Sequence, residues 1–307
     1  MVLVRAPARV GLLGNPSDIY RGKAISFSVG LFAEVKVSRR PEGLEVRAGQ
    51  GGGRGGRSLI ESAVTLLDER FGTGRRFSIE YSTEVPQRSG LGGSASIAVA
   101  VIMAVGAVCG LFLSEAEVAD LALEAERRMG IIAGPQDRYA ISMGGLLYMD
   151  FSTRPYRVER LDSALEALKG RYFIVITGRP GEETSGDVHR AVFERFKRGD
   201  PKVRETMESI ASLADEGFDL LLKGDLEGLA DLMNENFRLR ASIFNIGGPD
   251  RKVVELAQRA GAGAKLCGSS GSVVVLDITG RARAEISALG FPVIEPALGP
   301  GPTVARL

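Results

Sequence analysis

Apolar and polar residues alternate in short runs over the first 80 positions of the chain, which predicts β-strands separated by turns. The predicted strands cover residues 2–4, 9–13, 24–29, 33–38 and 77–81. We expect residues 44–47 to form a further strand that pairs with residues 33–38. Apolar residues then recur at helical spacing over residues 58–71, which predicts an amphipathic helix. Its apolar face consists of Leu59, Ala63, Leu66 and Leu67.

The pattern continues with a capped helix and then restarts near the middle of the chain. Ser114 and Glu117 have the spacing of a capping box, which predicts a helix over residues 115–129. Further strands are predicted at residues 144–151, 171–177 and 272–276, and further helices at residues 185–198, 202–223, 226–239 and 282–289. A polar, proline-containing stretch separates the halves, so we expect domains at residues 1–153 and 154–307. Strands and helices that occur in runs indicate an α+β fold.

Residues 97–113 form the longest apolar segment, and no charged residue occurs from Ser89 to Ser114. A membrane-spanning helix needs about 20 apolar residues. This segment is rich in alanine and glycine, which permit close packing, and no basic cluster marks a cytoplasmic side. We therefore expect a helix buried in the protein core.

A glycine-rich segment, residues 86–96, directly precedes this apolar run and reads Pro-Gln-Arg-Ser-Gly-Leu-Gly-Gly-Ser-Ala-Ser. Glycines before a helix leave backbone N–H groups free, and the helix dipole adds positive charge at the same place. The hydroxyls of Ser94 and Ser96 could reach a phosphate oxygen or a metal bound to one. The segment predicts a nucleotide-binding site.

The composition of the chain limits the classes of molecule that such a site could bind. The chain has 307 residues and a formal net charge of +1, so no overall field attracts nucleic acid or acidic membranes. Its two cysteines, Cys109 and Cys267, lie far apart, which fits a reducing cytoplasm better than a disulfide framework. The single histidine, His189, follows a glycine-rich loop at residues 178–186. It could touch a substrate, but we expect it on a helix surface. We expect a cytoplasmic monomer or homodimer that acts on a small molecule.

Residues 51–56 match the dinucleotide-binding pattern Gly-x-Gly-x-x-Gly by spelling. The preceding strand candidate is polar and charged, unlike the buried parallel strand that such a site requires. We interpret the segment as a flexible loop, not as the cofactor site of an oxidoreductase.

Three motifs in order resemble those of the GHMP kinases, a family of small-molecule kinases. They are residues 6–14, the glycine-rich residues 86–96 and a C-terminal turn at residues 265–271. Residues 8–18, 24–28, 130–138 and 233–237 are most similar to the glucuronokinase subfamily. Three departures occur: Gly93 replaces a serine, Ser270 replaces a glycine, and Arg9 replaces the lysine of mevalonate kinases, as in galactokinase.

The resemblance implies a two-domain GHMP kinase fold, ribosomal-S5-domain-2-like at the N-terminus and ferredoxin-like at the C-terminus. It implies phosphorylation of a sugar at its anomeric hydroxyl with ATP and Mg²⁺, and D-glucuronate is the leading candidate for that sugar. The family pattern assigns ATP binding to Pro86, Gly90, Leu91, Gly92, Gly93, Ser94, Ala95 and Ser96. A mevalonate or heptose kinase, or a binding protein on the same fold without catalysis, are the alternatives.

The family pattern also assigns the chemistry to named side chains. Ser94 and Glu126 would bind Mg²⁺, which prefers oxygen ligands. Asp137 would accept the proton of the attacking hydroxyl, and Arg9 would lower its pKa and stabilise the transferred phosphoryl group. The alternatives are helix capping for Ser94, a solvated helix position for Glu126 and an ordinary helix N-terminal acid for Asp137.

Substrate contacts are expected from a polar cluster after the first motif and from two later segments. Asp18 is the leading sugar contact, although its surroundings are also good turn chemistry. The other candidates are Asn15, Ser17, Arg21, Gly134, Gln136, Gly268 and Ser269. A uronate further needs a cation for its carboxylate. The sequence does not choose among Arg21, Arg88, Arg138 and Arg240.

Overall fold

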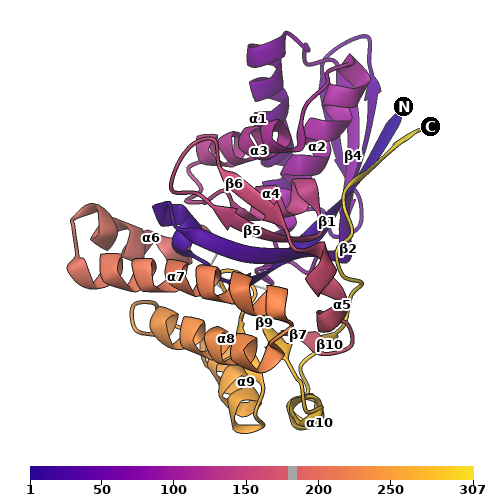
Figure 1. Ribbon diagram of the computed structural model, residues 1–307. Helices are drawn as coiled ribbons and strands as arrows, with labels where there is room; N and C mark the ends of the chain where they lie inside the picture. Colours follow the sequence, from indigo (N-terminus) through magenta and orange to yellow (C-terminus); the bar gives the residue numbers. More distant parts are fainter. Residues whose placement is uncertain (179–184) are drawn as a thin grey trace.

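Two β-sheets, one of seven strands and one of four, organise the chain in a computed structural model (Figure 1). The structure describes residues 1–178 and 185–307, so most of the glycine-rich loop predicted at residues 178–186 lies outside the described residues. Strands and helices occur in runs and not in strict alternation, as expected of an α+β chain.

The first sheet is built on two long antiparallel strands, β1 (Val2–Leu13) and β2 (Lys23–Arg39). Each joins two strands that the sequence predicts separately, because the ladder continues through residues 5–8 and residues 30–32, with a register shift after Pro7. The remaining strands of this sheet are β3 (Leu44–Ala48), β4 (Phe77–Thr83), β5 (Leu146–Asp150), β6 (Arg157–Arg160) and β11 (Thr303–Arg306).

The predicted pairing of residues 44–47 with residues 33–38 is wrong. Strand β3 pairs in parallel with β4, and β4 occupies the place beside β2. The connection between β3 and β4 is helix α1 (Arg54–Phe71), a crossover long enough for parallel pairing. A hairpin from β2 to β3 seemed natural in the sequence because the two segments are adjacent.

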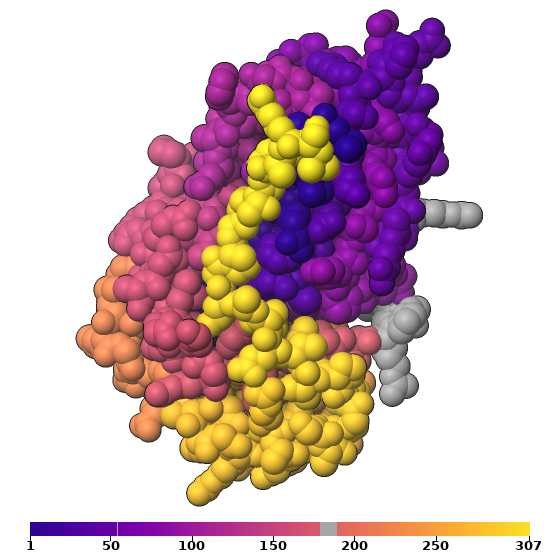
Figure 2. All heavy atoms as spheres, turned by 90° about the vertical axis from the view of Figure 1, so that its right-hand side faces the viewer, coloured from indigo at the N-terminus to yellow at the C-terminus, as the bar shows by residue number. Residues whose placement is uncertain are grey.

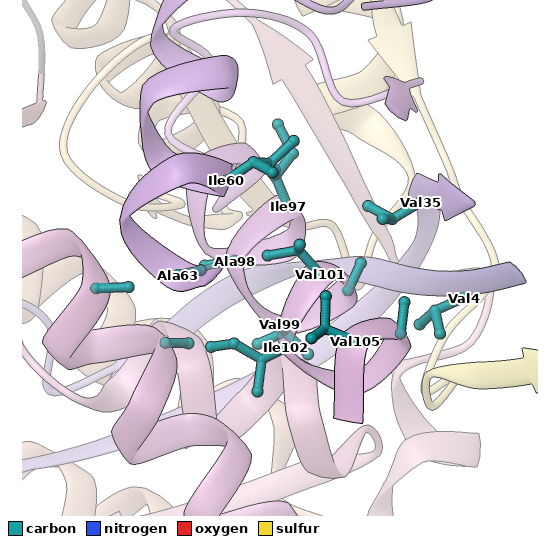
Figure 3. Packing of buried hydrophobic residues seen from close by; sticks show 14 of the residues in the cluster. Val4, Val35, Ile60, Ala63, Ile97, Ala98, Val99, Val101, Ile102 and Val105 are labelled. Atoms are coloured by element: carbon teal, nitrogen blue, oxygen red, sulfur yellow. The ribbon is translucent and has the colours of Figure 1, made fainter. Parts of the chain in front are cut away.

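Helix α2 (Gly93–Cys109) is enclosed between this sheet and neighbouring helices. Figure 3 shows its residues Val101 and Val105 near Val4 and Val35 of the sheet, and Ile97 near Ile60 of α1. Apolar residues on all sides of a helix require burial on all sides, and the expected core helix is confirmed. Within the described part of the chain, no helix is long and apolar enough to cross a membrane.

Two further helices complete this half: α3 (Glu115–Arg128) and α4 (Gln136–Met143). The predicted capping box is present, because the Ser114 hydroxyl accepts from the Glu117 backbone N–H and the Glu117 carboxylate accepts from the Ser114 N–H. The box fixes the start of α3, the helix that carries Glu126.

The second sheet has the order β10-β7-β9-β8. Its strands are β7 (Tyr172–Ile176), β8 (Gly263–Leu266), β9 (Ser272–Leu276) and β10 (Val293–Ile294). The helices of this half are α5 (Leu165–Leu168), α6 (Ser185–Lys197), α7 (Pro201–Lys223), α8 (Leu226–Ala241), α9 (Gly248–Arg259) and α10 (Arg281–Ser287). The sequence analysis missed α9, whose buried Val253, Val254 and Ala257 stand among many polar residues.

A shared core holds the two halves together. Leu13 and Ile25 of the first sheet belong to the same buried cluster as Ala214 of α7, Leu229 of α8 and Val274 of β9. The C-terminal strand β11 also returns to pair with β1, so both termini lie at one end of the molecule (Figures 1 and 2). The domain limits at residues 153 and 154 remain a prediction.

Candidate active site

A cavity of about 530 Å³ lies where the three glycine-containing motifs meet. The Arg9 N–H donates to the Leu91 carbonyl at 3.0 Å, and the Gly11 N–H donates to the Cys267 carbonyl at 2.8 Å. These backbone bonds join strand β1 to the second motif and to the turn after β8. A cavity of this size suits a small-molecule ligand.

Glycines allow the second and third motifs to touch backbone to backbone. A Cβ on Gly268 would lie 2.1 Å from the Gly90 carbonyl oxygen, and one on Gly90 would lie 2.5 Å from the Ser270 oxygen. Gly92, with φ 82°, caps α2 in a left-handed conformation that favours glycine. Any side chain at these positions would push the two loops apart.

The loop before α2 presents most of its predicted nucleotide-binding residues to the cavity. Pro86, Gly90, Leu91, Gly92, Gly93, Ser94 and Ala95 all line it. Ser96 points the other way, because its hydroxyl donates to the carbonyls of Pro7 at 2.7 Å and Gly92 at 3.0 Å. Ser96 therefore anchors the helix start to β1.

Ser94 and Glu126 form a hydrogen-bonded pair at the start of α2, 2.8 Å apart. The Glu126 side chain is 1% exposed and also forms an ion pair with the buried Arg138, so the solvated position considered for it is wrong. Both donors are oxygens, the ligand type that Mg²⁺ prefers. In the described ranges, no group of three or more His, Cys, Asp or Glu residues could hold a metal. Mg²⁺ at this pair would need the oxygens of a bound phosphate as further ligands.

Arg9 and Asp137 lie together across the cavity, joined by two hydrogen bonds of 2.7 Å each. The Arg9 guanidinium also donates to the Gly90 carbonyl at 2.6 Å. Burial works to raise the pKa of Asp137, but the charges of Arg9 and Arg138 and the Arg9 hydrogen bonds outweigh it and leave the pKa below its ordinary value. Asp137 is thus an ionised acceptor facing the cavity.

Asp18 is a second carboxylate in the same cavity, with a different protonation behaviour. Burial, and then the charge of Asp137, raise the pKa of Asp18 to about 6. Its carboxylate accepts from the Gln136 backbone N–H at 3.2 Å. A Cβ on Gly134 would lie 2.0 Å from Asp18 Oδ2, so glycine is required there to leave room for the carboxylate.

The other predicted substrate residues divide into two groups. Asn15, Gln136, Gly268 and Ser269 line the cavity with Asp18 and Gly134. The Asn15 amide oxygen accepts from the buried Lys265 ammonium, which fixes the Asn15 side chain. Ser17 and Arg21 instead line a separate groove beside α7, and the Ser17 hydroxyl donates to the Lys23 carbonyl at 2.8 Å.

Two parts of the cavity differ from the expectation. His189 is buried and lines the cavity, as a substrate contact would require, and is not on the expected helix surface. The end formed by α1 and its preceding loop is lined by Gly51, Gly53, Gly55, Gly56, Leu59, Val85, Ile97 and Met129. The segment at residues 51–56 therefore lies in the site, and residues 54–56 belong to α1 instead of the expected loop. Its glycine density was the available signal, and it was outweighed by the polar strand before it.

Two family models match the two halves of the chain: the N-terminal domain of GHMP kinases over residues 58–145 and the C-terminal domain over residues 218–289. Probable glucuronokinase 2 of Arabidopsis thaliana is 32% identical, over 92% of this chain and 86% of that protein. D-glycero-alpha-D-manno-heptose 7-phosphate kinase of Campylobacter jejuni is 28% identical, over 85% of this chain and 84% of that protein.

Solved structures show the same fold. Galactokinase of Lactococcus lactis, complexed with galactose, superposes with a TM-score of 0.79 at 17% identity, covering 98% of this chain and 95% of that one. The expected two-domain α+β fold is confirmed. This chain belongs to the GHMP kinase family, because both family models match it, its relatives align with nearly all of it, and its three motifs meet at one cavity.

Proposed function

We propose that this protein transfers the γ-phosphoryl group of ATP to the anomeric hydroxyl of a sugar, with D-glucuronate as the substrate. One observation carries the proposal. The start of α2, with the Ser94–Glu126 pair, and an ionised Asp137, held by Arg9, line one cavity. Phosphoryl transfer needs this combination of phosphate positioning, charge neutralisation and an acceptor for the hydroxyl proton.

We infer one orientation for ATP in the cavity from its lining. Its phosphates would bind to the N–H groups at the start of α2, where the helix dipole is positive. Its base would lie at the apolar end, between Leu59, Ile97 and Met129. Ser94 and Glu126 would hold Mg²⁺, which neutralises charge on the phosphates when bound.

Asp137 would act on the sugar hydroxyl. As oxygen attacks the γ-phosphorus, its proton passes to the Asp137 carboxylate, the new O–P bond forms, and the bond to the β,γ-bridging oxygen breaks to release ADP. Because the pKa of Asp137 is lowered, the carboxylate is ionised at neutral pH and ready to accept. Arg9 offers positive charge next to the transferred group.

Asp18 would bind sugar hydroxyls at the other end, supported by Asn15 and Gln136. The choice of a uronate rests on the similarity to glucuronokinases. Arg9 argues against mevalonate, whose kinases carry lysine at this place. A binding protein without catalysis is disfavoured because Ser94, Glu126 and Asp137 all line the cavity. We further infer a cytoplasmic enzyme, because its two free cysteines suit a reducing compartment. We expect it to act as a monomer or a homodimer.

Turnover tests this proposal. The protein is incubated with ATP, Mg²⁺ and, separately, D-glucuronate, D-galactose, a heptose phosphate or mevalonate, and ADP release is followed. We expect the highest kcat/KM with glucuronate. Turnover of mevalonate alone, or of no acceptor, would contradict it.

A further inference from the structure

Arg240 in α8 is a buried cation that no carboxylate contacts directly among the described residues. Its residue is 1% exposed, and its guanidinium donates to the carbonyls of Gly268 and Ser269 at 2.6 Å each. The negative charges of Asp250 and Asp18 act on it only from a distance, and its Nε atom has no hydrogen-bond partner. A buried charge that lacks a partner is costly, so a native protein normally supplies one.

His189 lies next to Arg240 and reaches the cavity. The His189 ring packs edge-on against Phe244 with centroids 5.6 Å apart, and the Arg240 guanidinium lies 5.1 Å from the centroid of the same ring. The His189 side chain lines the cavity, and its Nδ1 atom is buried with no partner. A buried polar atom of a residue that lines a ligand cavity commonly finds its hydrogen-bond partner in the ligand.

The local charges define what His189 can offer. Burial, and then the charge of Arg240, lower the pKa of His189 to about 3, so the ring is neutral at pH 7 and carries one N–H donor. Burial lowers the pKa of Arg240 to about 10, which leaves the guanidinium charged. This part of the cavity therefore combines a neutral donor in the wall with a positive charge behind it.

The other arginines considered for a carboxylate are engaged elsewhere. Arg138 forms its ion pair with Glu126 and donates to the Gly134 carbonyl at 2.9 Å. Arg21 lines the separate groove beside α7. Arg88 belongs to the phosphate-binding loop, at the nucleotide half of the cavity.

We propose that His189 and Arg240 form the subsite for the substrate carboxylate and so select uronates over neutral sugars. His189 donates its N–H to the carboxylate, and Arg240, hydrogen-bonded to the carbonyls of Gly268 and Ser269 behind the cavity wall, adds positive charge to the subsite. This inference rests on the proposed sugar kinase activity. It assigns a substrate role to two residues that carry neither the phosphate chemistry nor the proton transfer.

A comparison of glucuronate with its neutral amide, glucuronamide, separates the effect of the substrate's charge from the effect of its shape. We would measure kcat and KM for both in the wild type, Arg240→Met, Arg240→Lys, and Arg238→Met as an exposed control on the same helix. Because Arg240→Met removes a buried positive charge near the carboxylate, it should lower kcat/KM for glucuronate about 10- to 100-fold, mainly through KM. Glucuronamide should change by no more than about 3-fold, Arg240→Lys should recover part of the loss, and Arg238→Met should resemble the wild type.

Variants of His189 provide a second test, which can be carried out even if Arg240→Met does not fold. His189→Phe keeps a ring against Phe244 but removes the N–H, and should reduce the preference for glucuronate, while His189→Gln restores a donor and part of the preference. Equal losses with glucuronate and glucuronamide in these variants would show that both residues are only structural and would overturn the inference. A wild type that phosphorylates both equally would overturn it too and leave the proposed sugar kinase intact. Turnover of neither sugar would contradict the proposed function itself.

Discussion

Arg9 holds both carboxylate oxygens of Asp137, with Nε–Oδ1 and Nη2–Oδ2 distances of 2.7 Å. The two residues are 128 positions apart in the sequence, one on β1 and the other in the first turn of α4. A bidentate arginine–carboxylate pair is both strong and directional. It fixes where Asp137 meets the hydroxyl of a substrate, and it keeps the carboxylate ionised.

Asp137→Asn removes the proton acceptor while it preserves shape. We expect kcat to fall about 10²- to 10⁴-fold, the usual range for loss of a general base, with KM for ATP little changed. The half-buried Asp120, which pairs with Arg154 and accepts from the Tyr139 hydroxyl, does not line the cavity and provides the control Asp120→Asn, which should keep normal kinetics. Steady-state kinetics and a melting curve distinguish lost chemistry from lost folding. A folded Asp137→Asn protein with a near-normal kcat would refute the assignment of the base.

Asp18 predicts a pH dependence of stability. Its folded pKa is raised to about 6, so the stability that it contributes is fully present below about pH 4 and is lost as the pH rises through 6. Asp18→Asn should lack this loss. As the pH rises from 4 to 7, the free energy of unfolding of the wild type should therefore fall by up to about 3 kcal/mol more than that of the variant. Denaturant titrations across this range measure the shift, and parallel curves for the two proteins would contradict it.

Ser94 and Ser96 form a matched pair for the metal assignment. Ser94→Ala should raise the Mg²⁺ concentration needed for half-maximal rate about 10-fold or more, with a stability loss of about 1 kcal/mol. Ser96→Ala removes hydrogen bonds to Pro7 and Gly92, so it should lower stability without changing the Mg²⁺ requirement. Mg²⁺ titrations and thermal melts of both variants check this. Identical Mg²⁺ curves for Ser94→Ala and the wild type would argue against Ser94 as a ligand.

Gly134→Ala should damage the sugar half of the site and spare the nucleotide half. Its Cβ would collide with Asp18 Oδ2 at 2.0 Å, so Asp18 must move away from its contact with the Gln136 N–H. We expect KM for the sugar to rise at least about 10-fold, the effect of one lost hydrogen bond to a charged group, with KM for ATP unchanged. Gly248→Ala, where an added Cβ meets nothing within 4 Å, is the control. Equal effects on both substrates would show a wider disturbance.

Most of the nucleotide half of the site could be predicted from the sequence, because its residues lie close together along the chain. Glycines, serines and an apolar helix follow one another in residues 86–109, and the structure keeps them in one loop and one helix. Capping chemistry likewise placed the start of α3 at Ser114. Local rules do not reveal orientation, which is why Ser96 could not be distinguished from Ser94.

Long-range contacts explain what the sequence could not show. The burial of His189 depends on Phe244, 55 positions away, and the pairing of β3 depends on the crossover by α1. Arg240 was one of four candidate arginines until its burial and its lack of an ion pair set it apart. These facts arise when the two halves pack around one cavity.

Phosphorus NMR of the product formed from ATP, Mg²⁺ and D-glucuronate tests the proposed activity most directly. Transfer to the anomeric hydroxyl predicts one new phosphate-ester signal, coupled to the anomeric proton of the sugar and formed in step with ADP. A signal coupled to any other sugar proton, or ADP release with inorganic phosphate alone, would contradict the claim that this protein is a kinase for the anomeric hydroxyl.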